Sequence, residues 1–180
     1  MRFQSYPKYK PSGVEWLGDV PEHWITWKST HGFGLIGSGT TPKSDDAEYY
    51  DGTIPWVTTS ELRETVIRDT SAKVTESAIR DYQALRLYAK GTLLFAMYGA
   101  TIGRLGILGI AATVNQACAA LAKPIHLETY FVYYWLQMRR RTLVVLSAGG
   151  GQPNLSQQDI RQLRIPAPQL SEQRAIADFL

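Results

Sequence analysis

The chain has 180 residues, a hydrophobic fraction of 44% and a net charge of +3. Its length fits one domain with a real core, its apolar content is that of a soluble globular protein, and its mildly basic balance permits a polyanionic partner without requiring one. The single cysteine, Cys118, excludes a disulfide framework and favours a reducing, cytoplasmic compartment.

The start of the chain and its longest uncharged stretch argue against a secretory signal and a membrane span. The opening MRFQSYPKYKPSG contains no apolar run of the kind that secretory signals carry. Residues 105–122 are uncharged but include Asn115, Gln116 and several glycines. They fit buried strands better than a span, which needs roughly 20 mostly apolar residues. We therefore expect no membrane role.

The first 24 residues are rich in Pro, Lys and Trp, and we interpret them as an N-terminal arm. Trp16, Trp24 and Trp27 offer large apolar surfaces. We expect these three side chains to pin the arm to the domain.

A glycine-rich segment at residues 32–37 matches the pattern G-x-G-x-x-G. A dinucleotide site would need a helix that opens on these glycines, and Pro42 would break such a helix. We therefore predict a flexible loop here, followed by a polar loop from Gly37 to Asp46. A small nucleotide-dependent enzyme stays an alternative that rests on this segment alone.

The middle of the chain predicts a strand, a loop and a helix. Ile54 to Val57 has the composition of a short strand, and the polar residues from Thr58 to Arg63 form the loop after it. Thr75 is a suitable N-cap, which predicts a helix from there to about Arg86.

Three apolar segments follow in close succession, at residues 91–97, 105–110 and 116–121. Since short turns join them, they favour antiparallel strands. The turn from Tyr98 to Arg104 is not a phosphate loop, because no Gly-Lys-Ser/Thr follows it. We predict a tight turn whose glycines supply positive φ.

The C-terminal third predicts three helical segments. Residues 127–145 place aromatic and apolar side chains at helical spacing and end before the glycines at 149–151. Ser156 and Asp159 match a capping box that starts a short helix, and a proline-bounded strand end leads to a further helix from about Leu170. Together the elements predict an α+β fold: a mixed, largely antiparallel sheet with flanking helices, ending in the first turns of a long helix.

The sequence contains no known catalytic or metal-binding motif. His23, His31 and His126 are scattered, and one cysteine cannot complete a Cys/His cage, so we predict no metal site. The sequence has no Glu-x-Lys or Asp-x-Lys for a Mg²⁺-dependent nuclease, no G-x-S-x-G elbow and no Pro-Pro pair of the adenine-methyltransferase kind. We expect a chain that is not itself an enzyme, has no catalytic residues and binds no cofactor of its own.

Polar loops between the apolar strands supply hydrogen-bonding side chains instead. Arginine pairs well with guanine, and Asn or Gln with adenine, at about 1–3 kcal/mol of discrimination per bidentate contact. The alternative for any one loop is a solvated turn, and the run of arginines at 139–141 has the same two interpretations. The candidate DNA-binding residues are Thr40, Thr41, Lys43, Thr58, Thr59, Ser60, Arg63, Thr101, Arg104, Gln152 and Asn154.

Five stretches, in order along nearly the whole chain, resemble the specificity (S) subunit of type I restriction–modification systems. They are Val14–Trp24, similar to the opening arm; Gly37–Lys43, similar to the Gly-x-Thr-Pro loop; Ile54–Leu62, similar to the proline–tryptophan strand and loop, with Glu61 where Asp is usual; Gly91–Gly106 with Gly-Ala-Thr-Ile-Gly-Arg, followed by Asn115-Gln116-Ala117; and Gly151–Leu180, similar to the closing Leu…Ile-Pro-x-Pro…Glu-Gln…Ile signature. Their shared order makes the resemblance specific.

The resemblance implies a DNA target-recognition domain over residues 1–169, with the arm at 1–24, and the truncated start of the family's spacer helix at 170–180. It implies sequence-specific binding of double-stranded DNA that reads one half of a bipartite site, without catalysis by this chain. The implied partners are methyltransferase (M) subunits that use S-adenosylmethionine and a restriction (R) subunit that uses ATP and Mg²⁺.

Full-length members of that family hold two recognition domains and two long helices. We therefore expect a truncated chain or a half-subunit, which pairs with a second half-subunit or with itself through the spacer helix. The main alternative is a protein-interaction module that uses the aromatic helix at residues 127–145 and the apolar C-terminal segment, with the polar loops merely solvated.

Overall fold

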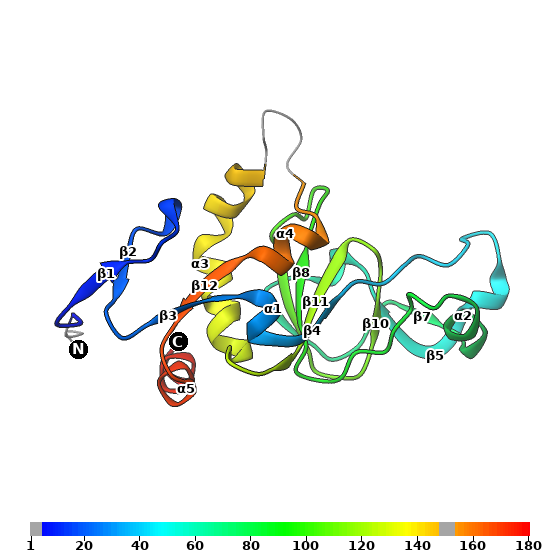
Figure 1. Cartoon of the computed structure of the whole chain (residues 1–180). Coiled ribbons are helices and arrows are strands. Elements are labelled where there is room, and N and C mark those ends of the chain that lie inside the picture. The colour runs from blue at the N-terminus through cyan, green and yellow to red at the C-terminus, as the bar shows by residue number, and fades with distance from the viewer. Residues whose placement is uncertain (1–4, 148–153) are drawn as a thin grey trace.

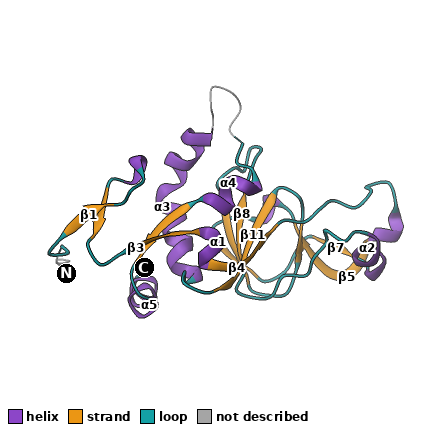
Figure 2. Ribbon diagram, viewed as in Figure 1, coloured by secondary structure: helices purple, strands orange, loops and turns teal. Residues whose placement is uncertain are grey.

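Residues 5–147 and 154–180 are described by the computed structural model of the chain (Figure 1). A five-stranded sheet lies at the centre, with smaller sheets to either side (Figure 2). The strands are β1 (Tyr9–Pro11), β2 (Asp19–Pro21), β3 (Ile25–Lys28), β4 (Phe33–Gly37), β5 (Tyr50–Val57), β6 (Thr65–Ile67), β7 (Ala72–Val74), β8 (Leu93–Ala96), β9 (Leu105–Leu108), β10 (Thr113–Val114), β11 (Cys118–Pro124) and β12 (Arg164–Ala167). The helices are α1 (Ser29–Gly32), α2 (Glu76–Asp81), α3 (Thr129–Ser147), α4 (Gln157–Gln162) and α5 (Leu170–Phe179), with 3-10 turns η1 (Glu15–Leu17), η2 (Ala47–Tyr49) and η3 (Thr59–Glu61).

The central sheet has the order β4-β11-β8-β9-β6. Neighbouring strands run antiparallel except β9 and β6, which run parallel. The predicted succession of three antiparallel strands is confirmed, because β8 pairs with both β9 and β11. The predicted fold class, α+β with a mixed and largely antiparallel sheet, is confirmed as well.

Apolar side chains fill both faces of the central sheet. Along β8, Leu93 and Phe95 pack in the cluster that includes α3, whereas Leu94 and Ala96 pack in the cluster on the other face. Successive side chains of a strand point to opposite faces, so a strand covered on both sides is apolar throughout. We call the central sheet with α3 the body of the molecule.

The predicted aromatic helix is confirmed as α3, although its expected end at the glycines 149–151 lies outside the described residues. Its inner face carries buried apolar side chains that cover the sheet, among them Phe131, Val132, Trp135 and Leu136. Among the described residues, no helix combines the length and the apolar character needed to cross a membrane. The predicted capping box is confirmed at Ser156 and Asp159, at the start of α4.

A smaller packed unit lies at the end of the molecule away from both termini (Figure 1). It comprises residues 43–57 and 69–85, and we call it the lobe. Within it β5 runs antiparallel to β7, and β5 also pairs in parallel with β10, which lies outside these residues. The lobe's buried apolar cluster consists of Trp56, Val74, Ala78 and Leu85.

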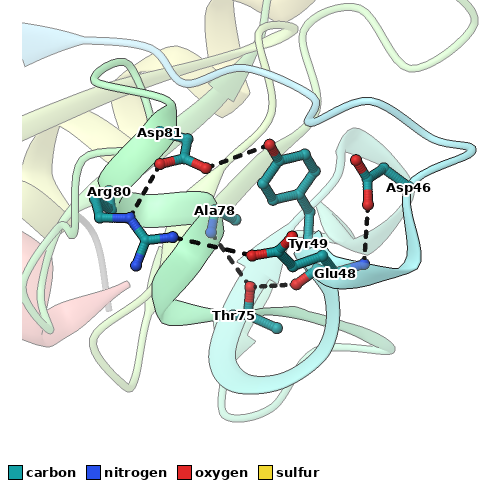
Figure 3. Close-up of polar contacts among 7 residues, drawn as sticks. All are labelled: Asp46, Glu48, Tyr49, Thr75, Ala78, Arg80 and Asp81. Atoms are coloured by element: carbon teal, nitrogen blue, oxygen red, sulfur yellow. Dashed lines mark hydrogen bonds and ion pairs between the residues drawn. The ribbon is translucent and has the colours of Figure 1, made fainter.

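Polar contacts join α2 to η2 on the surface of the lobe (Figure 3). The Thr75 hydroxyl accepts a hydrogen bond from the Ala78 N–H at 3.2 Å and donates one to the Glu48 carbonyl at 2.7 Å. The Arg80 guanidinium lies 3.1 Å from Asp81 and 3.9 Å from Glu48. The lobe therefore depends on polar contacts at its surface as well as on its small core.

The N-terminal arm packs against the body, and the expected attachment through its tryptophans is confirmed. The Tyr6 hydroxyl donates to the Glu172 carboxylate on α5 at 2.8 Å, and burial together with this carboxylate raises the pKa of Tyr6 to about 12. The ring pairs that hold the arm and the adjoining β3 have centroid distances of 6.0 Å for Trp16–Trp135, 5.9 Å for Trp24–Phe131 and 4.3 Å for Trp27–His126.

Two local predictions are wrong, and tertiary packing decides both. Residues 32–37, expected as a flexible loop, form the end of α1 and strand β4, because Phe33 and Ile36 enter the core and the backbone pairs with β11. The helix after Thr75 ends at Asp81 instead of near residue 86, since the chain turns there to bury Leu85 in the lobe.

Candidate nucleic-acid interface

All five strands of the central sheet end or begin at the same edge, where the predicted polar loops lie. The registers show this, because Gly37 lies opposite Ala120, Ala96 opposite Cys118, Phe95 opposite Leu105 and Thr65 beside Gly106. The segments at this edge are residues 38–43, 58–64, 98–104 and 115–117, together with Asn154, which forms a bridge with Tyr98. We call these segments the rim.

Gly39 lets the first rim segment pass close over β10. Its N–H donates to the Asn115 carbonyl at 3.3 Å, and a Cβ at this position would collide with the Val114 carbonyl oxygen. The Thr40 carbonyl then accepts a hydrogen bond from Trp56 Nε1 at 3.2 Å. The backbone of this segment is therefore held by the rim segment at Asn115 and by the lobe.

Thr41 and Lys43, from the same segment, have different surroundings. The Thr41 hydroxyl donates to Gln116 Oε1 at 2.6 Å, which joins two exposed side chains of the rim. The Lys43 N–H donates to the Tyr82 hydroxyl at 3.0 Å, and its ammonium group lies 3.6 Å from Asp45. Lys43 therefore belongs to the surface of the lobe rather than to the centre of the rim.

The second rim segment contains the 3-10 turn η3. The Glu61 carboxylate accepts hydrogen bonds from the N–H of Thr58 at 2.9 Å and of Ser71 at 2.7 Å. The Thr58 and Ser60 hydroxyls lie 2.8 Å apart, and Arg63 Nε donates to the Ser60 carbonyl at 3.1 Å. These contacts fix the polar side chains of the segment relative to one another.

The third rim segment is the turn between β8 and β9. Gly103 has a φ of +77°, and a Cβ there would lie 2.9 Å from Arg140 Cγ. Both the backbone conformation and the space available therefore favour glycine at this position. The Arg104 guanidinium meets the Glu64 carboxylate at two points, Nε to Oε1 at 2.8 Å and Nη2 to Oε2 at 2.7 Å. Arg140 lies 3.6 Å from the same carboxylate and donates to the Ile102 carbonyl at 3.3 Å.

Ten of the eleven candidate DNA-binding residues are among the described residues, and none of the ten is buried. Gln152 lies outside the described residues. The structure brings the ten together along the rim, with Lys43 at the end that adjoins the lobe, and their role in binding stays a prediction. The exposed ones are Thr41, Lys43, Ser60, Arg63 and Asn154, and the half-buried ones are Thr40, Thr58, Thr59, Thr101 and Arg104.

Residues 21–180 match the family model of the type I restriction modification DNA specificity domain. The chain belongs to this family. The MjaIX specificity subunit of Methanocaldococcus jannaschii is 28% identical over 169 residues, which cover 91% of the chain and 38% of that subunit. A specificity subunit of a type I restriction enzyme of Escherichia coli is 20% identical over 186 residues, covering 100% of the chain and 45% of that subunit. The chain spans less than half the length of these relatives.

Solved structures of the family share the fold of this chain. A chain from a structure of the assembly and conformational transition of a type I R-M system has a TM-score of 0.70 at 19% identity, covering 95% of this chain and 40% of that one. The HsdS subunit of Thermoanaerobacter tengcongensis has a TM-score of 0.66 at 18% identity, covering 95% and 38%. The fold of a specificity domain therefore extends over nearly the whole chain.

Sequence reasoning missed two polar residues of this specificity domain's rim. In the sequence Gln116 stands out only as part of a motif, yet its side chain accepts the Thr41 hydrogen bond. No sequence signal points to Glu64, although it joins two arginines from other elements and has a left-handed backbone with φ +54°. Forty positions separate Glu64 from Arg104, so no local pattern could pair them.

The rim offers hydrogen-bond donors and acceptors on a firm edge, which is chemistry suited to recognition. Among the described residues, no group of three or more His, Cys, Asp or Glu side chains could hold a metal ion. Cys118 begins β11 next to the rim, but it is fully buried. Burial and the nearby Glu61 raise the pKa of its thiol to about 12, so it packs as a neutral side chain.

One feature of the structure fits the alternative of a protein-interaction module. An apolar groove of about 510 Å³ lies between the arm, α3 and α5. It contains none of the candidate DNA-binding residues, and Phe131 and Trp135, two of the α3 aromatic residues that line it, are themselves buried. Its apolar lining includes Trp24, Phe131, Tyr134, Trp135, Met138, Ile176 and Leu180.

Proposed function

We propose that this chain is a DNA target-recognition domain that binds double-stranded DNA through the rim and reads one half of a bipartite site. The observation that carries the proposal is the meeting of the polar loops at one edge of the central sheet. A rigid sheet holds hydroxyl, amide and guanidinium groups there in fixed relative positions. Such groups discriminate bases through hydrogen bonds to their edges, whereas phosphate contacts only set register.

The distribution of charge supports binding by the body rather than by the lobe. The lobe, residues 43–57 and 69–85, carries seven acidic and three basic side chains, a net charge of −4. The rest of the chain carries +7, which makes up the total of +3. DNA is a dense polyanion, so this asymmetry favours an approach in which the lobe lies away from the phosphates.

The proposal assigns no chemistry to the chain itself. Methyltransferase subunits with S-adenosylmethionine, and a restriction subunit with ATP and Mg²⁺, would supply methylation and cleavage in the complete complex. Residues 1–169 would form the recognition domain. Helix α5, which begins at Leu170, would be the start of the helix that sets the distance to the other half-site.

Selection from a randomised duplex library tests the proposal. We expect the purified chain to enrich one short motif, with an affinity that falls as salt rises because phosphate contacts release counterions. Arg104→Ala should weaken binding of the selected duplex more than that of an unrelated duplex if Arg104 reads a base. A chain that enriches no motif, or that alone cuts or methylates a plasmid, would contradict the proposal.

A further inference from the structure

We propose that Glu64 is a positioning residue, which holds Arg104 so that the outer edge of its guanidinium faces a guanine in the recognised half-site. The inference rests on the proposed function and adds to it both a residue and a base. It comes from the way in which the two side chains meet.

The contact uses one edge of the guanidinium and leaves another edge open. Arg104 donates to the Glu64 carboxylate through Nε at 2.8 Å and through Nη2 at 2.7 Å. A guanidinium carries five N–H groups in a planar fork, so both N–H groups of Nη1 and the second one of Nη2 remain. Those of Nη1 and Nη2 form the outer edge, which matches the O6 and N7 acceptors of guanine in the major groove.

The open edge reaches solvent. The Arg104 side chain is 33% exposed, whereas that of Glu64 is 20% exposed. Arg104 Nη1 has no hydrogen-bond partner among the described residues. It is also not one of their unpaired buried atoms, which are Trp24 Nε1 and Arg139 Nε. Nη1 is therefore accessible to an incoming base.

Glu64 is itself held from two other elements, β9 and α3, so it can act as a fixed support. Its N–H donates to the Leu105 carbonyl of β9 at 2.9 Å, and its carbonyl accepts from the Tyr133 hydroxyl of α3 at 2.8 Å. Arg140, also on α3, lies 3.6 Å from the carboxylate. A free arginine side chain has considerable rotamer entropy, and a side chain ordered before binding loses less of it on binding.

The same contact controls the charge that Arg104 presents. With Glu64 in place, two guanidiniums share one carboxylate. Without that carboxylate, Arg104 becomes a mobile cation that can bind any phosphate. Glu64 therefore favours the recognised sequence in two ways: it orients the arginine for a base, and it weakens the attraction for unrelated DNA.

The test compares Glu64→Gln with a matched control, Asp51→Asn. Asp51 is exposed and, like Glu64, has a left-handed backbone, with φ +57°. Its substitution by Asn removes one negative charge, as Glu64→Gln does. Asp51 lies roughly 20 Å along β5 from the rim, at about 3.3 Å per strand residue. Dissociation constants are measured at two salt concentrations for the selected duplex, for the same duplex with each guanine replaced in turn, and for an unrelated duplex.

We expect Glu64→Gln to reduce discrimination at one guanine about tenfold while its affinity for the unrelated duplex rises. Asp51→Asn should leave the discrimination unchanged. Arg104→Lys keeps the charge but lacks the fork, so it should lose discrimination at the same guanine and keep its affinity for unrelated DNA. In an Arg104→Ala background, Glu64→Gln should cause no further loss of discrimination.

Several outcomes would overturn the inference. A loss of affinity by Glu64→Gln that is equal for all three duplexes would show a merely structural role. Should that variant fail to fold, unchanged discrimination by Arg104→Lys would overturn the inference by itself. A wild-type chain that selects no sequence would remove the proposed function, and this inference with it. If the wild-type chain selects a motif but Glu64→Gln discriminates at its guanines as well as the wild-type chain does, the inference about Glu64 is wrong while the proposed function stands.

Discussion

The body and the lobe are held together in different ways. The body has a large apolar core that fills both faces of the central sheet, and side chains such as Leu93 and Phe95 are fully buried there. The lobe has a cluster of four buried apolar residues and a surface network of hydrogen bonds and exposed ion pairs. Exposed ion pairs contribute little to stability, so we expect the lobe to open more readily than the body.

The difference divides the rim into two sets of residues. Arg104 and Asn154 are held by residues next to the strands of the body, Glu64 and Tyr98. The segment from Thr40 to Lys43 is also held by the lobe, through Trp56 Nε1 and through the Tyr50 hydroxyl, which donates to the Pro42 carbonyl at 2.7 Å. The two sets should therefore respond differently when one of the units is weakened.

Phe95→Ala should have the largest effect, because it removes a fully buried ring from the body. Such a change typically lowers the free energy of unfolding by about 3–5 kcal/mol. Urea unfolding followed by tryptophan fluorescence measures it. Leu87→Ala is the control, since Leu87 is 55% exposed and a surface change usually alters stability by less than about 0.5 kcal/mol. Similar losses in both variants would contradict the account of the body's core.

Leu85→Ala should destabilise mainly the lobe. Leu85 is 2% exposed and belongs to the lobe's small cluster, so we expect a cost of about 2 kcal/mol, the lower end of the range for such changes. Hydrogen exchange should show faster opening of β5, β7 and α2, with protection of β8 and β9 retained. An equal loss of protection in β8 would show that the two units unfold as one.

High pH should weaken the body through Cys118. Its pKa is raised from 9.0 to about 12 by burial, so between these values the unfolded chain loses the thiol proton while the folded chain keeps it. The free energy of unfolding should therefore fall as pH rises above 9, by about 1.4 kcal/mol per pH unit from this group. Cys118→Ala removes this contribution, so urea titrations at pH 8 and 10 should show a smaller fall in the variant. An equal fall in both proteins would rule out the thiol as its source.

Local patterns in the sequence were sufficient for part of the fold. Short turns between the apolar segments at 91–97, 105–110 and 116–121 correctly predicted antiparallel strands. The spacing of aromatic residues correctly predicted α3, and the pair Ser156 and Asp159 correctly predicted the start of α4. Each of these signals depends on residues that are close in sequence.

Contacts between distant segments could not be predicted in this way. Strand β4 contains two glycines, so its local pattern favours a loop, whereas its pairing with β11 joins residues more than 80 positions apart. The parallel pairing of β6 with β9 has no local pattern either. The rim shows the same limit: its polar loops were found as separate segments, whereas the sheet register brings them to one edge and pairs Glu64 with Arg104.

The smallest effect is expected at the polar surface of the lobe, where Thr75 caps α2. Thr75→Ala removes the hydroxyl that accepts from the Ala78 N–H at 3.2 Å and donates to the Glu48 carbonyl at 2.7 Å. Loss of an N-cap typically costs about 1 kcal/mol. Because the lobe is expected to open on its own, this cost should appear as faster hydrogen exchange in α2, with little change in global unfolding by urea.

Thr75→Ser is the matched control, since serine keeps both hydrogen bonds and caps helices at least as well as threonine. It should exchange like the wild-type chain. If Thr75→Ala instead lowers the midpoint of global unfolding as much as Leu85→Ala does, the surface network and the small core belong to the same cooperative unit as the body. The segment from Thr40 to Lys43 would then be as firmly held as Arg104, and the two parts of the rim would not differ in rigidity.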